Sequence, residues 1–250
     1  MMTGDEMKQN LLLNFPDELI EMTFLERPNR FILHCFSNET KEIERVHLAD
    51  PGRLIELLRE GSTIYVLPSK NPNRKTKWTA VYVEWNGKFV SINTTYPNKL
   101  VELVLKQNKI KELAFYHWVK SEYTYGHSRW DFLLENELGE QLLLEVKSVT
   151  MGKDGIGLFP DAVTKRGTKH VTELTSIVKD GSIKGAILFI VQREDVSIVT
   201  GATSIDPDFS QSLQDAEKAG VLLLSYTCVL SEEGIALGNS IPVDPYLSLS

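Results

Sequence analysis

The chain has 250 residues, of which 42% are hydrophobic and 24% charged, and its formal net charge is −7. These values are typical of a water-soluble globular protein with enough length for one large domain or two smaller ones. The negative charge does not indicate nucleic-acid binding, so any such binding must come from a locally basic surface.

Nothing in the sequence indicates a membrane span or a secreted protein. No apolar stretch reaches eighteen residues, and the N-terminal segment lacks the apolar core of a signal peptide. The two cysteines, Cys35 and Cys228, lie far apart without metal-type spacing. We expect both to be small core residues of a cytoplasmic protein in a reducing compartment.

The first part of the chain is predicted to consist of short strands. The expected strands are Leu11–Asn14, Ile20–Glu26, Phe31–Ser37, Thr63–Pro68, Thr79–Trp85 and Lys88–Asn93, with a tight turn at Asn86-Gly87. A short helix from Arg53 to Arg59 is expected, with Asp50 as its N-cap and Gly61 at its end. Together these elements predict a small oligonucleotide/oligosaccharide-binding (OB)-like β-barrel domain over residues 8–95.

The pattern changes near Thr94–Asn98, and residues 96–250 are expected to form an α/β domain. Its elements are a helix from 99 to about 120, strands at 122–125, 128–135 and 141–148, a helix from Asp161 to Lys179, a buried parallel strand Ala186–Gln192, a helix over 209–219 and a strand over 221–226. Asp161 is the expected N-cap of the second helix. This order predicts a nuclease-like α/β core, and hence a two-domain α/β protein.

Three polar residues on two of these strands form a candidate site. The midpoint between Asp131 and Glu145 falls inside a turn signal that ends near Gly139, so a regular hairpin places the two carboxylates directly opposite each other. Leu133, Leu143 and Lys147 are expected on the same face as these carboxylates because side chains alternate along a strand. Two opposed carboxylates repel, whereas a divalent cation between them would convert the repulsion into ligation. Mg²⁺ favours such sites.

The other face of this hairpin is expected to be core. It collects Trp130, Phe132, Leu134, Leu142, Leu144 and Val146. A solvated strand face with a Glu/Lys pair is the alternative interpretation of the polar residues, and the hairpin alone favours that alternative. The surrounding residues favour the interpretation as a metal site.

Several neighbouring residues could complete such a site. Glu122, on the preceding strand, is a candidate third metal ligand or else an exposed acid. Arg129 would pair with Asp131 or with a phosphate. The glycine-rich loop 152–157 could bring backbone N–H groups and Lys153 to a phosphate.

A charged helix face adds to the candidate phosphate contacts. Helical spacing groups Lys165 with Lys169 and Arg166 with His170 on adjoining parts of one face. Such a face is usually just solvated, but here it follows the carboxylate hairpin by one loop.

Several longer motifs closely resemble the sugar fermentation stimulation protein A family. They are Ser128-Arg129-Trp130-Asp131-Phe132, Glu145-Val146-Lys147-Ser148-Val149-Thr150, Phe159-Pro160-Asp161-Ala162, Arg166-Gly167-x-Lys169-His170-x-x-Glu173-Leu174 and, in the first half, Asn29-Arg30-Phe31, His47-Leu48 and Gly52-Arg53-Leu54. The resemblance covers nearly the whole chain. It implies an OB-like N-terminal half, a C-terminal half similar to PD-(D/E)xK nucleases and an association with DNA.

The motifs and the resemblance together favour a DNA-binding, metal-dependent phosphodiesterase. Asp131, Glu145 and Lys147 are the expected catalytic residues, and Mg²⁺ or Mn²⁺ is expected on Asp131, Glu145 and Glu122. The expected contacts to the phosphate backbone of DNA are Arg53, Arg129, Lys153, Arg166, Lys169 and His170.

The alternative is a DNA-binding regulator of sugar metabolism genes, built on a nuclease-like scaffold with little or no cleavage. A sugar-processing enzyme has little support, because the sequence offers no second pair of catalytic acids. DNA is the expected partner and no membrane partner is expected. A homodimer and a monomer are both compatible with the sequence.

Overall fold

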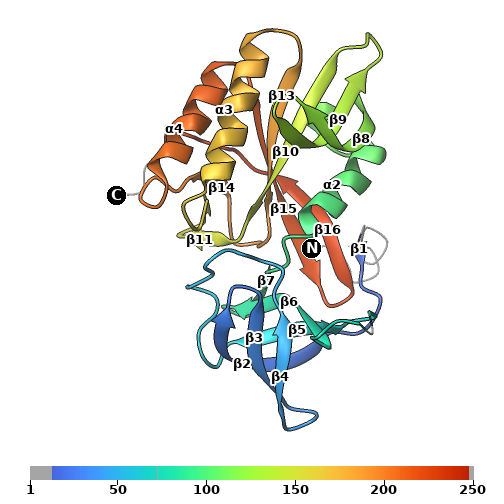
Figure 1. The fold of residues 1–250 in the computed structure, drawn as a ribbon, viewed down its shortest axis with the longest axis vertical. Coiled ribbons are helices and arrows are strands. Elements are labelled where there is room, and N and C mark those ends of the chain that lie inside the picture. Colours follow the sequence, from blue (N-terminus) through green and yellow to red (C-terminus); the bar gives the residue numbers. More distant parts are fainter. Residues whose placement is uncertain (1–12, 72, 248–250) are drawn as a thin grey trace.

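The computed structural model describes residues 13–71 and 73–247, which form two lobes (Figure 1). The smaller lobe contains β2 (Ile20–Asn29), β3 (Ile32–Ser37), β4 (Ile43–His47), β5 (Thr63–Pro68), β6 (Trp78–Trp85) and β7 (Lys88–Ser91). These strands pair in the order β4-β3-β2-β5-β6-β7, and β4 also pairs with β6, which closes a five-stranded barrel. The predicted OB-like barrel is therefore confirmed.

Alternating side chains fill this barrel. Met22, Leu33, Val46 and Ile64 are each fully buried in its core. The predicted turn between β6 and β7 is also present, with positive φ at Asn86 and Gly87. The strand β4 was not predicted, because charged residues surround Val46, its single buried apolar side chain.

The short helix predicted over Arg53–Arg59 is absent, and turns replace it. Arg27 explains the difference, since its guanidinium donates to the carbonyls of Asp50, Gly52 and Arg53 at 3.0, 2.7 and 2.8 Å. Those carbonyls are therefore not free to accept the amides of a helix. Leu54 has a φ of 52°, which also interrupts a right-handed helix.

The larger lobe is an α/β layer structure, as predicted. Its seven-stranded sheet has the order β1-β16-β15-β13-β10-β9-β8, in which β10, β13 and β15 run parallel. The strands are β1 (Leu13–Asn14), β8 (Tyr116–Tyr125), β9 (Ser128–Asn136), β10 (Gln141–Val149), β13 (Lys184–Val191), β15 (Leu222–Ser231) and β16 (Gly234–Ser240). A small sheet, β11 (Met151–Lys153), β12 (Ile156–Phe159) and β14 (Ile198–Gly201), adjoins it.

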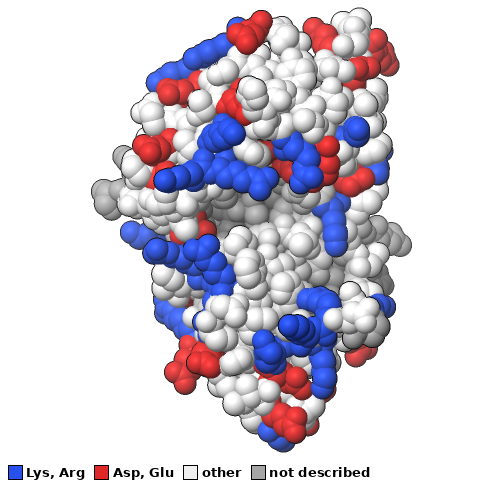
Figure 2. Space-filling model, viewed as in Figure 1, with Lys and Arg blue, Asp and Glu red and all other residues white. Residues whose placement is uncertain are grey.

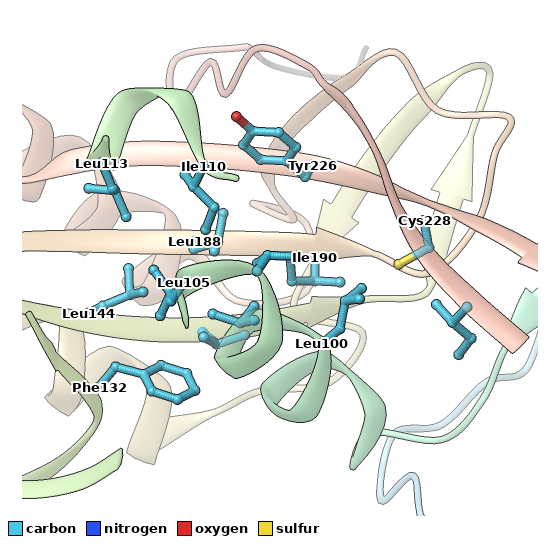
Figure 3. Close-up of a cluster of buried hydrophobic side chains, with 14 of the residues drawn as sticks. Leu100, Leu105, Ile110, Leu113, Phe132, Leu144, Leu188, Ile190, Tyr226 and Cys228 are labelled. Atoms are coloured by element: carbon cyan, nitrogen blue, oxygen red, sulfur yellow. The ribbon is translucent and has the colours of Figure 1, made fainter. Parts of the chain in front are cut away.

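Helices cover both faces of the large sheet. Helix α2 (Tyr96–Lys106) and the 3₁₀ turn η1 (Lys111–Leu113) pack on one face, in the cluster drawn in Figure 3. Helices α3 (Lys165–Lys179) and α4 (Pro207–Lys218) pack on the other face. The central strands are therefore buried on both sides, which explains their nearly continuous apolar sequences.

Because helices pack on both faces of the sheet, the predicted division of the β9–β10 hairpin into one core face and one polar face is wrong. Leu133 and Leu143, expected on the polar face, are buried beneath α3 and α4. Trp130, expected on the opposite face, joins them in that cluster, and its indole N–H donates to the Tyr125 carbonyl at 3.0 Å.

Several element boundaries also differ from prediction. Residues 116–120, expected as helix, begin β8, where aromatic residues alternate along an edge strand. The glycine-rich segment 152–157 is the β11–β12 hairpin, with its turn at Asp154-Gly155. The N-cap of α3 is Thr164, whose hydroxyl accepts the Gly167 amide, and Asp161 lies outside the helix.

The first strand belongs to the larger lobe. Leu13 and Asn14, placed in the predicted 8–95 domain, pair with Ile235 and Gly234 at the edge of the large sheet. Residues 8–12 of that predicted domain lie outside the described residues. Within the described part of the chain, no helix is long and apolar enough to cross a membrane.

The predicted cysteine environments are confirmed. Cys35 and Cys228 are both buried and free, Cys35 in the barrel core and Cys228 in the α2 cluster. Burial raises the pKa of both thiols to about 12, so neither forms a reactive thiolate at neutral pH.

The two lobes share core residues. Tyr82 of β6 is fully buried in the cluster around α2, and its hydroxyl donates to the Gly234 carbonyl at 3.1 Å. The barrel therefore contributes side chains to the core of the larger lobe.

We predict that Tyr82→Phe lowers the free energy of unfolding by about 0.5–1.5 kcal/mol, because the Gly234 carbonyl loses its buried donor. Urea denaturation measures the change. Tyr65→Phe is the matched control, since its hydroxyl contacts Glu84 at 3.3 Å on the exposed barrel surface. Equal effects of the two substitutions would contradict the assigned role of the interlobe bond.

Candidate functional site

The β9–β10 hairpin has the predicted register but opens before the candidate acids. The last pair in its ladder joins Leu144 to Phe132, and the next pair in that register would be Glu145 with Asp131. At that point Asp131 Oδ2 instead accepts the Val146 amide at 2.7 Å. Where the two strands diverge, the Asp131 carboxylate thus accepts a backbone amide that a backbone carbonyl would accept in a regular ladder.

Asp131 is also held by helix α2. Its Oδ1 accepts the side-chain amide of Asn98 at 2.7 Å, so both carboxylate oxygens have donors. Asn98 lies in the first turn of α2, and no pattern in the sequence marked it as a site residue.

Glu145 is nearly enclosed, with its side chain 7% exposed. Its Oε1 lies 2.6 Å from Lys147 Nζ and 2.9 Å from His170 Nδ1. Its Oε2 is buried without a hydrogen-bond partner among the described residues. An unpaired carboxylate oxygen in such a place is costly unless another group binds it.

The pKa values of the two acids are shifted in opposite directions. Burial and the charge of Glu145 raise the pKa of Asp131 to about 6. Burial also acts to raise the pKa of Glu145, but the hydrogen bond with His170 and the charge of Lys147 outweigh it and hold that pKa below its usual value. Both groups are therefore mainly ionised at neutral pH, and they repel each other.

These features fit a bound divalent cation. Two neighbouring carboxylates and one unpaired oxygen supply hard, anionic ligands. Within the described residues, no group of three or more His, Cys, Asp or Glu side chains is placed to hold a metal. Backbone carbonyl, water or phosphate oxygens would have to supply the other ligands, as is common for Mg²⁺.

Glu122 does not join the two acids. It lies on β8 with a φ of 56°, and its side chain forms an exposed 2.6 Å ion pair with Arg129. The expected third-ligand role of Glu122 is therefore corrected, and Arg129 pairs with Glu122 where a bond to Asp131 or to a phosphate was expected.

The basic residues predicted on the surface of helix α3 differ in their exposure. Arg166 and Lys169 are exposed, as a phosphate contact requires. His170 is 9% exposed and faces Glu145, with the Trp130 ring 5.8 Å away. The predicted phosphate contact by His170 is therefore wrong, because helix packing turns this side chain inward to hold an acid.

A cleft of about 800 Å³ lies between the lobes and is called the interlobe cleft. Its walls are Arg27, Asn29, Arg30, residues 50–53, Ile55, Thr94, residues 146–148 of β10, Thr150, and residues 159–164. Figure 2 shows a hollow between the lobes with Lys and Arg on both of its sides. Lys147 of the candidate site lines this cleft, as does the predicted phosphate contact Arg53.

Lys153 lies apart from that cleft. It lines a neighbouring hollow of about 470 Å³ together with Trp85 and Arg193. The guanidinium of Arg193 is buried and bonded to Asp195 and to the Thr150 carbonyl. Lys153 itself is exposed and free to meet an anion approaching the edge of β11.

Two acids predicted as helix caps instead hold the loop at the cleft floor. Asp50 Oδ1 accepts the Gly52 amide at 2.7 Å, and Asp161 Oδ2 accepts the Leu54 amide at 3.4 Å across the two lobes. A Cβ at Gly52 would lie 2.8 Å from Asp50 Oδ1 and closer still to Asp161, so a side chain here would displace both carboxylates. Burial raises the pKa of Asp50 to about 6, and the nearby charge of Asp161 adds to the effect.

Two family models match consecutive parts of the chain. A family model described as the SfsA N-terminal OB domain matches residues 25–92, and one described as the sugar fermentation stimulation protein RE domain matches residues 95–234. The chain is 44% identical over 226 residues to a sugar fermentation stimulation protein homolog of Shouchella clausii, covering 90% of this chain and 97% of that protein. A homolog of Clostridium tetani is 42% identical over 220 residues, or 88% of this chain and 94% of that protein.

One solved structure matches nearly the whole chain. It is the structure of Pyrococcus furiosus SfsA in complex with Ca²⁺, with a TM-score of 0.85 and 28% sequence identity. The match covers 94% of this chain and 99% of that chain.

We predict that Asp50→Asn stabilises the protein at pH 7 by on the order of 1–3 kcal/mol, because it removes a buried charge but keeps the Oδ1 acceptor. The pKa of Asp50 rises from 3.8 to about 6 on folding, so its protonated form favours the folded state below pH 4. That contribution is lost as the pH rises through about 6.

Urea unfolding of both proteins at pH 4, 5, 6 and 7 tests this prediction. The stability gain of the variant should be small at pH 4 and should grow until the pH exceeds about 6. A gain that is constant over this range would show that Asp50 has an ordinary pKa. Asp244→Asn serves as the control, because the Oδ1 of half-buried Asp244 likewise accepts a backbone amide two residues along the chain, that of Tyr246.

Proposed function

The chain belongs to the sugar fermentation stimulation protein family, and we propose that it is a DNA-binding, metal-dependent phosphodiesterase. The observation that carries the proposal is the pair of half-buried Asp131 and buried Glu145, with one unpaired oxygen on Glu145, beside Lys147. Placing two acids that repel each other in a largely enclosed site is expensive unless a ligand compensates them.

Asp131 and Glu145 would hold Mg²⁺ or Mn²⁺. The related Pyrococcus furiosus SfsA was solved as a complex with Ca²⁺, which supports a divalent cation in this family. When bound, such an ion would supply a water of lowered pKa and would neutralise charge on a phosphate.

The surrounding side chains have distinct tasks in this proposal. Asn98 and the Val146 amide fix the orientation of Asp131, while His170 fixes that of Glu145. Lys147 has its ammonium on Glu145 and lines the cleft, so it can donate to a phosphate oxygen or orient the attacking water. Rigid placement of this kind is what a reacting group requires.

DNA is the proposed substrate because basic side chains surround the site. Arg53 lines the cleft, and Arg166 and Lys169 are exposed on α3, which begins directly after the cleft residue Thr164. These residues would contact phosphates and position the strand without reading its sequence. A local basic surface also offsets the net charge of −7.

A regulator that binds DNA with little or no cleavage is the second candidate. One observation favours it, namely that the described residues contain no cluster of three metal-ligating side chains. Two carboxylates alone could leave the metal weakly held and turnover low.

We predict that Asp131→Ala and Lys147→Ala each reduce metal-dependent DNA cleavage by about 10²-fold or more, because each removes charge at the reacting phosphate. Asp131→Ala should also weaken Mg²⁺ or Mn²⁺ binding in isothermal titration, whereas Lys147→Ala should retain a metal site. Glu135→Ala on β9 and Lys120→Ala on β8 are controls outside the site.

The outcomes separate the two candidates. A folded Asp131→Ala protein that cleaves DNA like the wild type would overturn the site assignment. Wild-type protein that binds DNA but neither binds metal nor cleaves any branched, single-stranded or duplex substrate would favour the regulator.

We predict that Arg166→Ala weakens DNA binding by a similar factor for all sequences and lowers the salt dependence of log K by about one counterion, because the residue contacts phosphate. Fluorescence anisotropy from about 50 to 200 mM salt measures both effects. Lys184→Ala is the matched control, since Lys184 pairs with Leu142 at the opposite end of β10 from Lys147. Equal salt slopes for wild type and Arg166→Ala would exclude this contact.

A further inference from the structure

The interlobe cleft has an apolar side chain exposed on each of its walls. Ile55, from the smaller lobe, is 68% exposed, and Val163, from the larger lobe, is 67% exposed. Both line the cleft, together with the partly buried Phe159. Single exposed apolar residues are ordinary, but two that line the same charged cleft from opposite lobes indicate a ligand with an apolar face.

The charges around these side chains favour an anionic ligand. Arg30 and Arg53 are exposed at the cleft, whereas the guanidinium of Arg27 is occupied by backbone carbonyls. The opposing acids are Asp50 and Asp161, whose carboxylates accept backbone amides at the floor. The guanidinium groups of Arg30 and Arg53 are therefore exposed to an anion in the cleft, whereas both acids already accept backbone amides.

The size of the cleft limits the form of that ligand. A volume of about 800 Å³ is that of a site for one drug-sized molecule, which corresponds to about one or two nucleotides. A double helix cannot enter such a hollow whole. Unpaired nucleotides can, because their bases expose flat apolar faces as well as edges.

We propose that the interlobe cleft binds unpaired nucleotides of a DNA strand, with the bases against Ile55 and Val163 and the phosphates on Arg30 and Arg53. Apolar side chains that contact or separate bases are a known means of holding unstacked nucleotides. The proposal rests on the DNA-binding function proposed above and names the form of DNA that the cleft accepts. Lys147 lines the same cleft, so the bound strand would pass beside the candidate catalytic residues.

Fluorescence anisotropy in EDTA tests the proposal without any cleavage. The probes are labelled single strands of about 20 nucleotides, blunt duplexes of the same sequence, and duplexes with a central mismatched bubble. The wild type should bind the single strand and the bubble about tenfold or more tightly than the blunt duplex. Ile55→Ala combined with Val163→Ala should remove about tenfold of that preference and change duplex binding less than twofold.

Leu138→Ala provides the matched control, because Leu138 is 86% exposed at the β9–β10 turn, away from the cleft. All three positions are exposed, so the variants should fold, and thermal unfolding verifies this. A 2-aminopurine base in the bubble adds a second readout, since its fluorescence should rise on binding to wild type but not to the double variant.

Each outcome has one meaning. Equal affinity for single strand and duplex, or a double variant with unchanged preference, would overturn the cleft assignment while DNA binding stands. Tight binding of the single strand but not of the bubble would restrict the cleft to free strand ends and tails, in support of the proposal. Absence of binding to every probe in EDTA, together with neither binding nor cleavage of any probe in Mg²⁺, would overturn the DNA-binding function itself, and with it this inference.

Discussion

The position of β10 governs the chemistry of this molecule. The strand lies between antiparallel β9 and parallel β13, and helices cover both faces of the sheet. Charged groups in such a place must find partners inside the protein. Glu145 and Lys147 neutralise each other at 2.6 Å, and His170 adds a second bond to the same oxygen. One oxygen of Glu145 remains without a partner among the described residues, and it is the oxygen that a bound metal would contact in the proposed site.

Local patterns in the sequence predicted the local structure well. The turn signal near Gly139 predicted the correct register of β9 and β10, and Asn86-Gly87 correctly marked a tight turn. The OB-like barrel and the α/β lobe followed from the order of the elements. Each of these features depends on residues close together in the chain, where periodicity and turn chemistry are decisive.

The errors arose where distant residues override local preference. Arg27 binds the carbonyls of residues 50–53, so a segment with good helix signals forms turns. Asp161 looked like a helix cap, yet it bonds the Leu54 amide 107 positions away. His170 has the spacing of a surface residue, but α3 packs against the sheet and turns it toward Glu145. A single sequence contains no local signal for such contacts.

The shared core of the two lobes constrains how this architecture can change. Tyr82, Val81 and Leu67 come from barrel strands but pack among residues of the larger lobe. An OB-like barrel is often regarded as a module that can be exchanged between proteins. Here the exchange would leave a void beneath α2 and β16, so a replacement barrel must carry matching side chains on β5 and β6. Substitutions in the shared core of one lobe therefore require matching substitutions in the other, so we expect the two lobes to evolve as one unit.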